Sequence, residues 1–278
     1  MKKKLLLLFL LLLLIPAYVS AGEKSPWEAR LPFESATIHY TISGTKDGSE
    51  VLYVRKYGSE VATYHTTKAS MLGIIIANET VSIDKPDWLY RFDLTEKTGS
   101  KRVNPKKYLI EEYKLLSEEE QKLVVQNGEK MGVTMAEGFG GSVQQNAETI
   151  LGYSCDRAEM IGTVAYSIHG SGIPLLVESN LMGLVMKIEA TSIDVGKVAE
   201  KYFQFPEGIE VHFDSGSDAI AREMAKQTIS ELKDPEGKEK IRMPILKGQQ
   251  PRMTPEEREQ MQQAMELLKG MFGTQPQQ

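Results

Sequence analysis

The histidines are the first residues of this sequence to consider for chemistry, because they can bind metal ions and transfer protons. There are four of them, His39, His65, His169 and His212. None has the spacing that places two ligands on one helix face or in one metal-binding loop. His39 and His65 could lie on neighbouring strands and share a metal ion, but ordinary polar strand positions explain them more simply. We predict no metal site and no cofactor.

Nucleophilic catalysis is not indicated by the serines or by the single cysteine. The sequence has no Gly-x-Ser-x-Gly motif. Cys155 has no second cysteine to pair with in the chain, and we interpret it as a small buried apolar side chain rather than a reactive or intermolecularly paired thiol. Residues 138–142 resemble a phosphate-binding loop, but no Lys-Ser or Lys-Thr pair follows. This segment is either a flexible connection or a flap over a cavity. We predict that the protein is not an enzyme.

The N-terminal segment has the pattern of a cleavable secretory signal peptide. Three lysines after Met1 precede an apolar run at residues 5–15, and Val19-Ser20-Ala21 supplies the small residues for cleavage after Ala21. The apolar run is shorter than the roughly 20 residues needed to cross a bilayer, so a membrane anchor is the weaker alternative. We expect residues 1–21 to be removed and the mature protein to be periplasmic rather than secreted, and not an integral membrane protein.

The charge of the chain argues against a nucleic-acid partner. The formal net charge is −5, and removal of the three signal lysines makes it −8. No run of basic residues remains that could follow a phosphate backbone. We therefore predict no nucleic-acid binding.

Alternation of apolar and polar residues predicts a first antiparallel meander. Ile38, Tyr40 and Ile42 alternate with polar residues, as expected for a half-buried strand. The following strands are expected at residues 51–57, 61–68, 72–84 and 88–94, with turns between them. The three consecutive isoleucines at residues 74–76 are too continuous to be exposed, so we expect them to be buried.

A helical period interrupts the strands and is followed by a second meander. Residues 105–127 are predicted to be helical, and a capping box that begins at Ser117 divides them into two helices. The glycine-rich residues 128–141 are predicted to form a mobile loop. Strand patterns return at residues 149–160, 163–169, 173–178, 184–193 and 202–205. This order predicts an α+β fold with a strongly curved antiparallel sheet, a half-open barrel covered by helices.

The last part of the chain is predicted to be a helical extension. The main β-domain is placed at residues 27–213, with the helical insertion at 105–127. The extension, residues 214–278, contains helices at 217–233 and 254–272, and a linker at 234–251 separates them. The second helix has a methionine-rich face that is a candidate docking surface for a protein partner.

The order of short motifs along residues 35–211 resembles the LolA-like fold of periplasmic lipoprotein-localisation factors, and most closely an uncharacterised domain family of that fold. In the first half the motifs are Ser49-Glu50, Tyr53, Tyr57-Gly58, Asn78-Glu79-Thr80, Ile83-Asp84, Tyr90, Asp93-Leu94 and Asn104-Pro105. In the second half they are Glu148-Thr149-Ile150-Leu151-Gly152-Tyr153, Cys155, Gly172-Ile173-Pro174-Leu175, Phe205-Pro206 and Gly208-Ile209. The resemblance implies a half-open barrel whose apolar interior is lidded by helices and holds acyl chains.

Together these observations lead to the hypothesis of a periplasmic binding or carrier protein for a lipid or another apolar small molecule. Trp88, Tyr90 and Phe92 alternate and so share one strand face, as plain core or as the lining of a cavity. The residues predicted to line the cavity are Ile38, Tyr40, Trp88, Tyr90, Phe92, Met186 and Ile188. The alternative is a non-enzymatic structural or signalling module of the envelope, which would bind a protein partner through its C-terminal helices.

Overall fold

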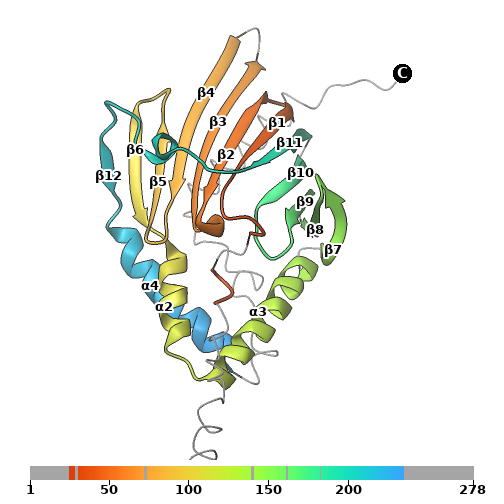
Figure 1. Cartoon of the computed structure of the whole chain (residues 1–278), viewed down its shortest axis with the longest axis vertical. Coiled ribbons are helices and arrows are strands. Elements are labelled where there is room, and N and C mark those ends of the chain that lie inside the picture. Colours follow the sequence, from red (N-terminus) through yellow and green to blue (C-terminus); the bar gives the residue numbers. More distant parts are fainter. Residues whose placement is uncertain are drawn as a thin grey trace, which may run out of the picture. The chain divides into compact units, whose positions relative to one another are not determined.

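The part of the chain that the structure describes is an α+β unit dominated by one open, curved sheet (Figure 1). This computed structural model describes residues 25–28, 31–71, 74–138, 141–160, 162–181 and 183–234. All described residues belong to one compact unit, which ends at Gly237. Residues 1–21, most of the predicted linker and the predicted helix at 254–272 lie outside the described residues.

Within the described residues, twelve strands form a single sheet in the order β12-β6-β5-β4-β3-β2-β1-β11-β10-β9-β8-β7. Neighbouring strands are antiparallel, except that β12 and β6 are parallel. The strands are β1 (Ala36–Gly44), β2 (Asp47–Arg55), β3 (Glu60–Met71), β4 (Ile74–Asp84), β5 (Trp88–Asp93), β6 (Thr98–Val103), β7 (Ser142–Ile150), β8 (Tyr153–Met160), β9 (Thr163–Ile168), β10 (Pro174–Leu181), β11 (Leu184–Val195) and β12 (Val211–Phe213).

Three α-helices of the described part lie beyond one end of the strands, where α2 and α4 run side by side (Figure 1). They are α2 (Pro105–Lys114), α3 (Glu118–Gly138) and α4 (Gly216–Leu232), and two short 3-10 helices are η2 (Lys56–Gly58) and η3 (Glu200–Phe203). The predicted joint at Ser117 is confirmed. The Ser117 amide donates to the Glu120 carboxylate at 3.0 Å, and the Glu120 amide donates to the Ser117 hydroxyl at 3.3 Å. This reciprocal pair is a capping box for α3.

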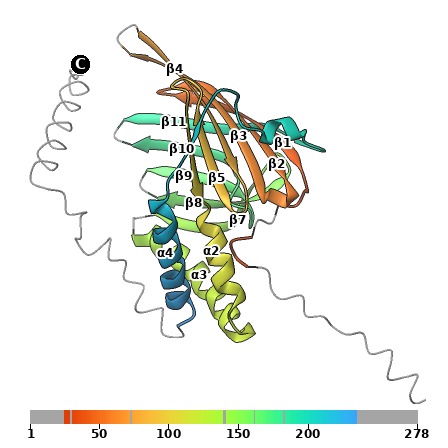
Figure 2. The ribbon, with the colours of Figure 1, turned by 90° about the vertical axis from the view of Figure 1, so that its left-hand side faces the viewer.

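One face of the sheet is concave because strands that are far apart in the sheet order share a core on it. Ile38 of β1 and Leu52 of β2 cluster with Cys155 of β8 and with Leu175 of β10. Such contacts require the sheet to bend around this face. In Figure 2, β8–β11 accordingly run at a steep angle to β3–β5. We call the side of the sheet that carries Ile38 the concave face.

The opposite, convex face of β3–β5 is covered by the segment that connects β11 to β12. Phe92 and Val81 are almost completely buried there, together with Val198 and Phe203 of the connecting segment. The Tyr202 ring stacks on the Tyr53 ring at 3.8 Å between centroids. The sheet therefore has two separate apolar cores, one on each face.

Several predictions about local structure are wrong. Residues 128–138 were expected to belong to a mobile loop but belong to α3. Residues 202–205 were expected to be a strand, but the first two belong to η3 and the other two to no helix or strand. Strands β6 and β12 and most of β7 were not predicted. The isoleucines at 75 and 76 are 72% and 53% exposed, although burial was expected for this run. A run of apolar residues shows that burial would be favourable, but at this hairpin no element lies over them among the described residues.

Packing of α3 against α4 explains why the helix continues past Gly128. Asn127 is 3% exposed, and its side-chain amide donates to the backbone carbonyls of Leu232 and Asp234 at 2.8 and 3.2 Å. These bonds satisfy carbonyl groups at the C-terminal end of α4 that the helix itself leaves unpaired. Val124 is completely buried beside Ile229 of α4. These contacts outweigh the cost of a helical glycine, which is about 1 kcal/mol.

Glu60 helps to fix η3 on the convex face. Its carboxylate accepts hydrogen bonds at 2.6 Å from Arg55 and at 2.6 Å from Lys56, and Arg55 also pairs with Glu200 and lies 3.8 Å over the Phe203 ring. Burial raises the pKa of Glu60, but Lys56 and Arg55 lower it by more, so its net pKa is below the ordinary value of 4.5. Glu60→Gln should reduce the free energy of unfolding by about 2 kcal/mol at neutral pH.

The pH dependence of this effect can be measured by denaturant titration. Because the folded-state pKa is lowered, the stabilisation is present above the unfolded-state pKa and is lost as the pH falls through the folded-state value. The difference between the wild type and Glu60→Gln should therefore shrink on acidification. Glu178→Gln, at an exposed carboxylate, is the control and should change stability by less than about 0.5 kcal/mol. A difference that does not vary with pH would contradict this account.

Candidate functional site

The concave face of β2–β6 carries side chains in rows that run across the strands. Because neighbouring strands are paired without a register shift here, every second residue points to the same side. The outer row contains Glu50, His65, Thr80, Asp93 and Thr98. The middle row contains Thr63, Ser82, Arg91 and Ser100. The inner row, next towards α2, contains Val61, Asp84 and Leu89.

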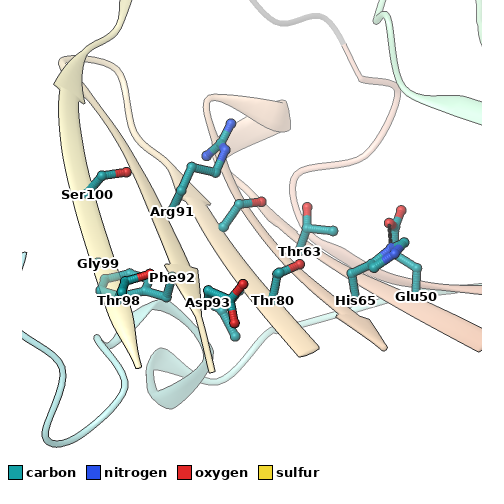
Figure 3. A pocket seen from close by; sticks show the side chains of 12 residues that line it. Glu50, Thr63, His65, Thr80, Arg91, Phe92, Asp93, Thr98, Gly99 and Ser100 are labelled. Atoms are coloured by element: carbon teal, nitrogen blue, oxygen red, sulfur yellow. Dashed lines mark hydrogen bonds and ion pairs between the residues drawn. The ribbon is translucent and has the colours of Figure 1, made fainter. Parts of the chain in front are cut away.

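The outer and middle rows line a polar pocket of about 530 Å³. Figure 3 shows Glu50 and His65 at one end of this pocket and Ser100 at the other, with Thr63, Thr80 and Arg91 between them. The His65 ring nitrogen Nδ1 lies 2.9 Å from the Glu50 carboxylate. Arg91 pairs with Asp84 and also donates to the Tyr90 carbonyl at 2.8 Å. Both of these bonds use the same guanidinium nitrogen, Nη1, of Arg91.

The hydroxyl groups of the polar pocket are available to a ligand. They belong to Thr63, Thr80, Ser82, Thr98 and Ser100. Within the described part of the chain none of the five forms a side-chain hydrogen bond, and all five residues are partly or fully exposed. A hydroxyl both donates and accepts hydrogen bonds, so these groups can pair with either kind of ligand atom.

A second pocket of about 760 Å³ lies between the inner row and helix α2. Val61 and Leu89 form its sheet wall, and Leu109 and Ile110 form its helix wall. Trp27 and Tyr57 add aromatic surface, and ion pairs lie at its rim, between Lys107 and Asp87 at 3.4 Å and between Lys114 and Glu28 at 3.5 Å. We call it the sheet–helix pocket. Its volume is in the range typical of small-molecule sites.

The two pockets follow one another along the same strands. Val61 and Thr63 are successive concave-face residues of β3, and Leu89 and Arg91 are successive concave-face residues of β5. Successive residues on one strand face are about 7 Å apart. The ion pair between Arg91 and Asp84 joins the polar pocket to the sheet–helix pocket. The concave face thus has its apolar side chains near α2, alongside charged residues, and becomes polar away from that helix.

The structure does not bring the seven predicted lining residues together. Ile38 and Tyr40 are buried in the concave core, with Ile188 packed against it. Met186 lies further along β11 and is 38% exposed. Tyr90 and Phe92 belong to the convex core, where Trp88 packs against them. Trp88, Tyr90 and Phe92 therefore lie on the opposite side of the sheet from Ile38. Of the seven residues only Phe92 lines either pocket, and it lines the polar pocket.

Tyr40 has a structural partner rather than an open hydroxyl. Its hydroxyl donates to the Pro174 carbonyl at 2.8 Å, and this bond links β1 to the start of β10. Burial raises the pKa of Tyr40, and the nearby Glu50 carboxylate raises it further. Tyr40 therefore stays protonated at neutral pH and keeps this hydrogen bond.

The histidines do not meet in one site. His39 lies beside Asp194, His65 beside Glu50 and His169 beside Asp156. The register of β1–β3 puts His39 on the convex side and His65 on the concave side, so the two do not face each other. Among the described residues there is no group of three or more histidine, cysteine, aspartate or glutamate side chains placed to hold a metal ion.

No helix of the described part has the length and hydropathy needed to span a bilayer.

The residues of the polar pocket were not singled out from the sequence. Their signal was present as polar residues at every second position of β3, β4 and β5, such as Thr63, His65 and Thr67. Such alternation is normally interpreted as the solvent-facing side of a half-buried strand. Only the bend of the sheet makes this side the floor of a pocket.

Comparison with known proteins does not assign this chain to a family. No protein-family model and no curated protein matches the sequence. An uncharacterised conserved protein from Thermus thermophilus is similar in structure with a TM-score of 0.38 and 6% identity, over 66% of this chain and 91% of that one. PNGF-II is similar with a TM-score of 0.34 and 12% identity, over 72% of this chain and 33% of that one. Likenesses of this size support no inference about function.

A substitution at Phe92 tests whether the aromatic side chains of β5 are core. Phe92 is 1% exposed, so Phe92→Ala should reduce the free energy of unfolding by roughly 3–5 kcal/mol. The matched control is Phe213→Ala, at a ring that is 51% exposed and meets Trp88 edge-on, with an expected cost of about 1 kcal/mol. Denaturant unfolding measures both. Equal costs would mean that the convex core is not formed as described.

The reactivity of Cys155 tests the burial of the concave core. Its side chain is completely buried, and burial raises the pKa of the thiol. Thiol reagents react with the thiolate, so a disulfide reagent should modify the native protein far more slowly than the protein in denaturant. The absorbance of the thiolate that the reagent releases on modification gives both rates. Equally fast modification in native buffer would show that the β8 part of the core opens readily.

Proposed function

We propose that this protein is an exported, non-enzymatic binding or carrier protein of the periplasm, which holds a lipid or another apolar ligand between its curved sheet and helix α2. In this proposal residues 1–21 act as the export signal, and the sheet and helices form a half-open barrel of the LolA type. The C-terminal segment, with its predicted second helix, follows the barrel in the sequence. No cofactor takes part.

The sheet–helix pocket is the observation that carries this proposal. Its two walls come from the concave face of β3–β5 and from α2, which is the arrangement expected of a cavity between a curved sheet and a covering helix. Val61, Leu109 and Ile110 offer apolar surface that is only partly buried. An apolar ligand that covers this surface removes it from water, at about 25 cal/mol per Å².

The distribution of the cores also supports binding rather than a fully packed sheet. Strands β3–β5 are stabilised from the convex side by Val81, Ile83 and Phe92. Their concave side is therefore not needed to hold the strands together, and a cavity there costs little stability. A structural or signalling module would be expected to fill this space with its own side chains.

Native mass spectrometry of the full chain, purified gently from the periplasm, tests the proposal directly. A co-purifying acyl lipid in near-stoichiometric amount would support it and would identify the class of cargo. An empty protein that also ignores an apolar fluorescent probe would overturn it and favour the structural or signalling module. N-phenyl-1-naphthylamine is a suitable probe, because its emission rises in apolar surroundings.

Ile110 on the helix wall gives a targeted test. Ile110→Glu places a carboxylate against the apolar lining and should weaken probe binding at least tenfold, because a charge there must be desolvated when the ligand binds. The matched control is Ile220→Glu, at a helical isoleucine that is 62% exposed and does not line either pocket. Both variants should unfold within about 1 kcal/mol of the wild type. Equal probe affinity in the two variants would exclude the sheet–helix pocket as the binding site.

A further inference from the structure

The polar pocket lies next to the sheet–helix pocket and differs from it in chemistry. Thr63, Ser82 and Arg91 of the middle row follow directly on Val61, Asp84 and Leu89 of the inner row, each on the same strand and the same face. A ligand long enough to leave the apolar part near α2 therefore enters a region lined by hydroxyl and charged groups. A purely apolar ligand would leave these groups facing hydrocarbon, which is unfavourable.

From this arrangement we infer that the ligand is an amphiphile whose apolar chain lies in the sheet–helix pocket and whose polyhydroxylated, sugar-like headgroup lies in the polar pocket. This inference rests on the proposed function, because it needs an apolar chain in the neighbouring pocket. It adds a headgroup site and a chemical class of headgroup.

The five hydroxyl groups are the main reason for a polyhydroxylated headgroup. None of them has a side-chain partner within the described residues, and they are spread over β3, β4 and β6. A headgroup with several hydroxyls offers both donors and acceptors to such a surface, at many positions at once. The outer row crosses five strands, which is roughly 19 Å at about 4.8 Å between neighbours. This length accommodates more than one sugar ring.

The charges of the pocket argue against an anionic headgroup. Arg91 is the only arginine or lysine that lines the polar pocket among the described residues, and it already pairs with Asp84. Glu50 and Asp93 contribute two carboxylates. An anionic headgroup would therefore meet like charges at close range, without an unpaired cation to compensate.

Both carboxylates already have partners in the protein, so they give no reason to expect a cationic headgroup. Glu50 lies 2.9 Å from the His65 ring. One oxygen of Asp93 accepts from the backbone amides of Thr95 and Glu96 at 2.9 and 2.8 Å, and the other lies 3.5 Å from the Asn78 side-chain amide. A quaternary ammonium group has no hydrogen-bond donor or acceptor, so it would leave the five hydroxyls unmatched.

Three amphiphiles with the same dodecyl chain distinguish the contribution of the headgroup to affinity from that of the chain. Dodecyl maltoside, dodecyl sulfate and dodecyltrimethylammonium are titrated below their micelle concentrations into the full-length protein, and displacement of N-phenyl-1-naphthylamine is followed. The maltoside should bind at least tenfold more tightly than the other two, and free maltose should bind far more weakly than the maltoside. Equal affinity for the three dodecyl compounds, with the probe still displaced, would overturn the headgroup inference while leaving the apolar site in place.

Substitutions that remove single hydroxyl groups test whether the preference for dodecyl maltoside arises in the polar pocket. Thr80→Val and Ser82→Ala each remove one hydroxyl and should each weaken maltoside binding about fivefold, with probe affinity unchanged. The control is Thr66→Val, on the same sheet but on the convex side of β3, and it should leave both affinities as in the wild type. A maltoside preference that survives in the Thr80→Val/Ser82→Ala double variant would overturn the inference. Absence of binding of the probe and of every dodecyl compound would instead overturn the proposed function.

Discussion

The bend of the sheet around the concave core is the constraint on which the rest of the structure depends. Ile38 and Leu52 can reach Cys155 and Leu175 only if the strands between them curve. This burial covers the concave face of β1 and of β8–β10, and that of β2 except around Glu50, because the two halves of the sheet cover each other there. The concave face of β3–β6 lies outside this overlap, so it has no sheet partner. Both pockets of the candidate site lie on this remaining surface.

A sheet half with an open concave face needs stability from elsewhere, and the convex core supplies it. The segment between β11 and β12 lays Val198, Tyr202 and Phe203 over β2–β5. The network of Arg55, Glu60 and Glu200 holds the same segment through charged hydrogen bonds. Strands β3–β5 are thus half-buried like other strands, but from the side opposite to the main core. This division separates the residues that stabilise the fold from those free to bind a ligand.

The insertion between β6 and β7 completes one end of the concave surface. Its first helix, α2, is fixed by Asn104, whose side chain both accepts from the Lys106 amide at 3.1 Å and donates to the Lys85 carbonyl at 2.9 Å. Tyr108 and Ala225 then pack α2 against α4. The apolar residues Leu109 and Ile110 are held above the inner row in consequence. The gradient towards a more polar surface along β3–β5 follows from the position of this helix at one end of the strands only, and it would give an amphiphile bound as proposed one preferred orientation.

Periodicity in the sequence was enough to determine the strands β1–β5 and β8–β11, the helical insertion and its capping box at Ser117, because these signals depend on residues a few positions apart. It also showed that Trp88, Tyr90 and Phe92 share one side of a strand. It could not show which side of the sheet would be concave, or that this aromatic side would be covered by a segment more than a hundred residues later in the chain. The strand β6 is mostly polar and was missed because its stability comes from pairing with β5 and β12. The polar pocket was missed for the same reason: alternation fixes which residues lie together on a face, whereas the tertiary bend decides whether that face is core, solvent-exposed surface or binding site.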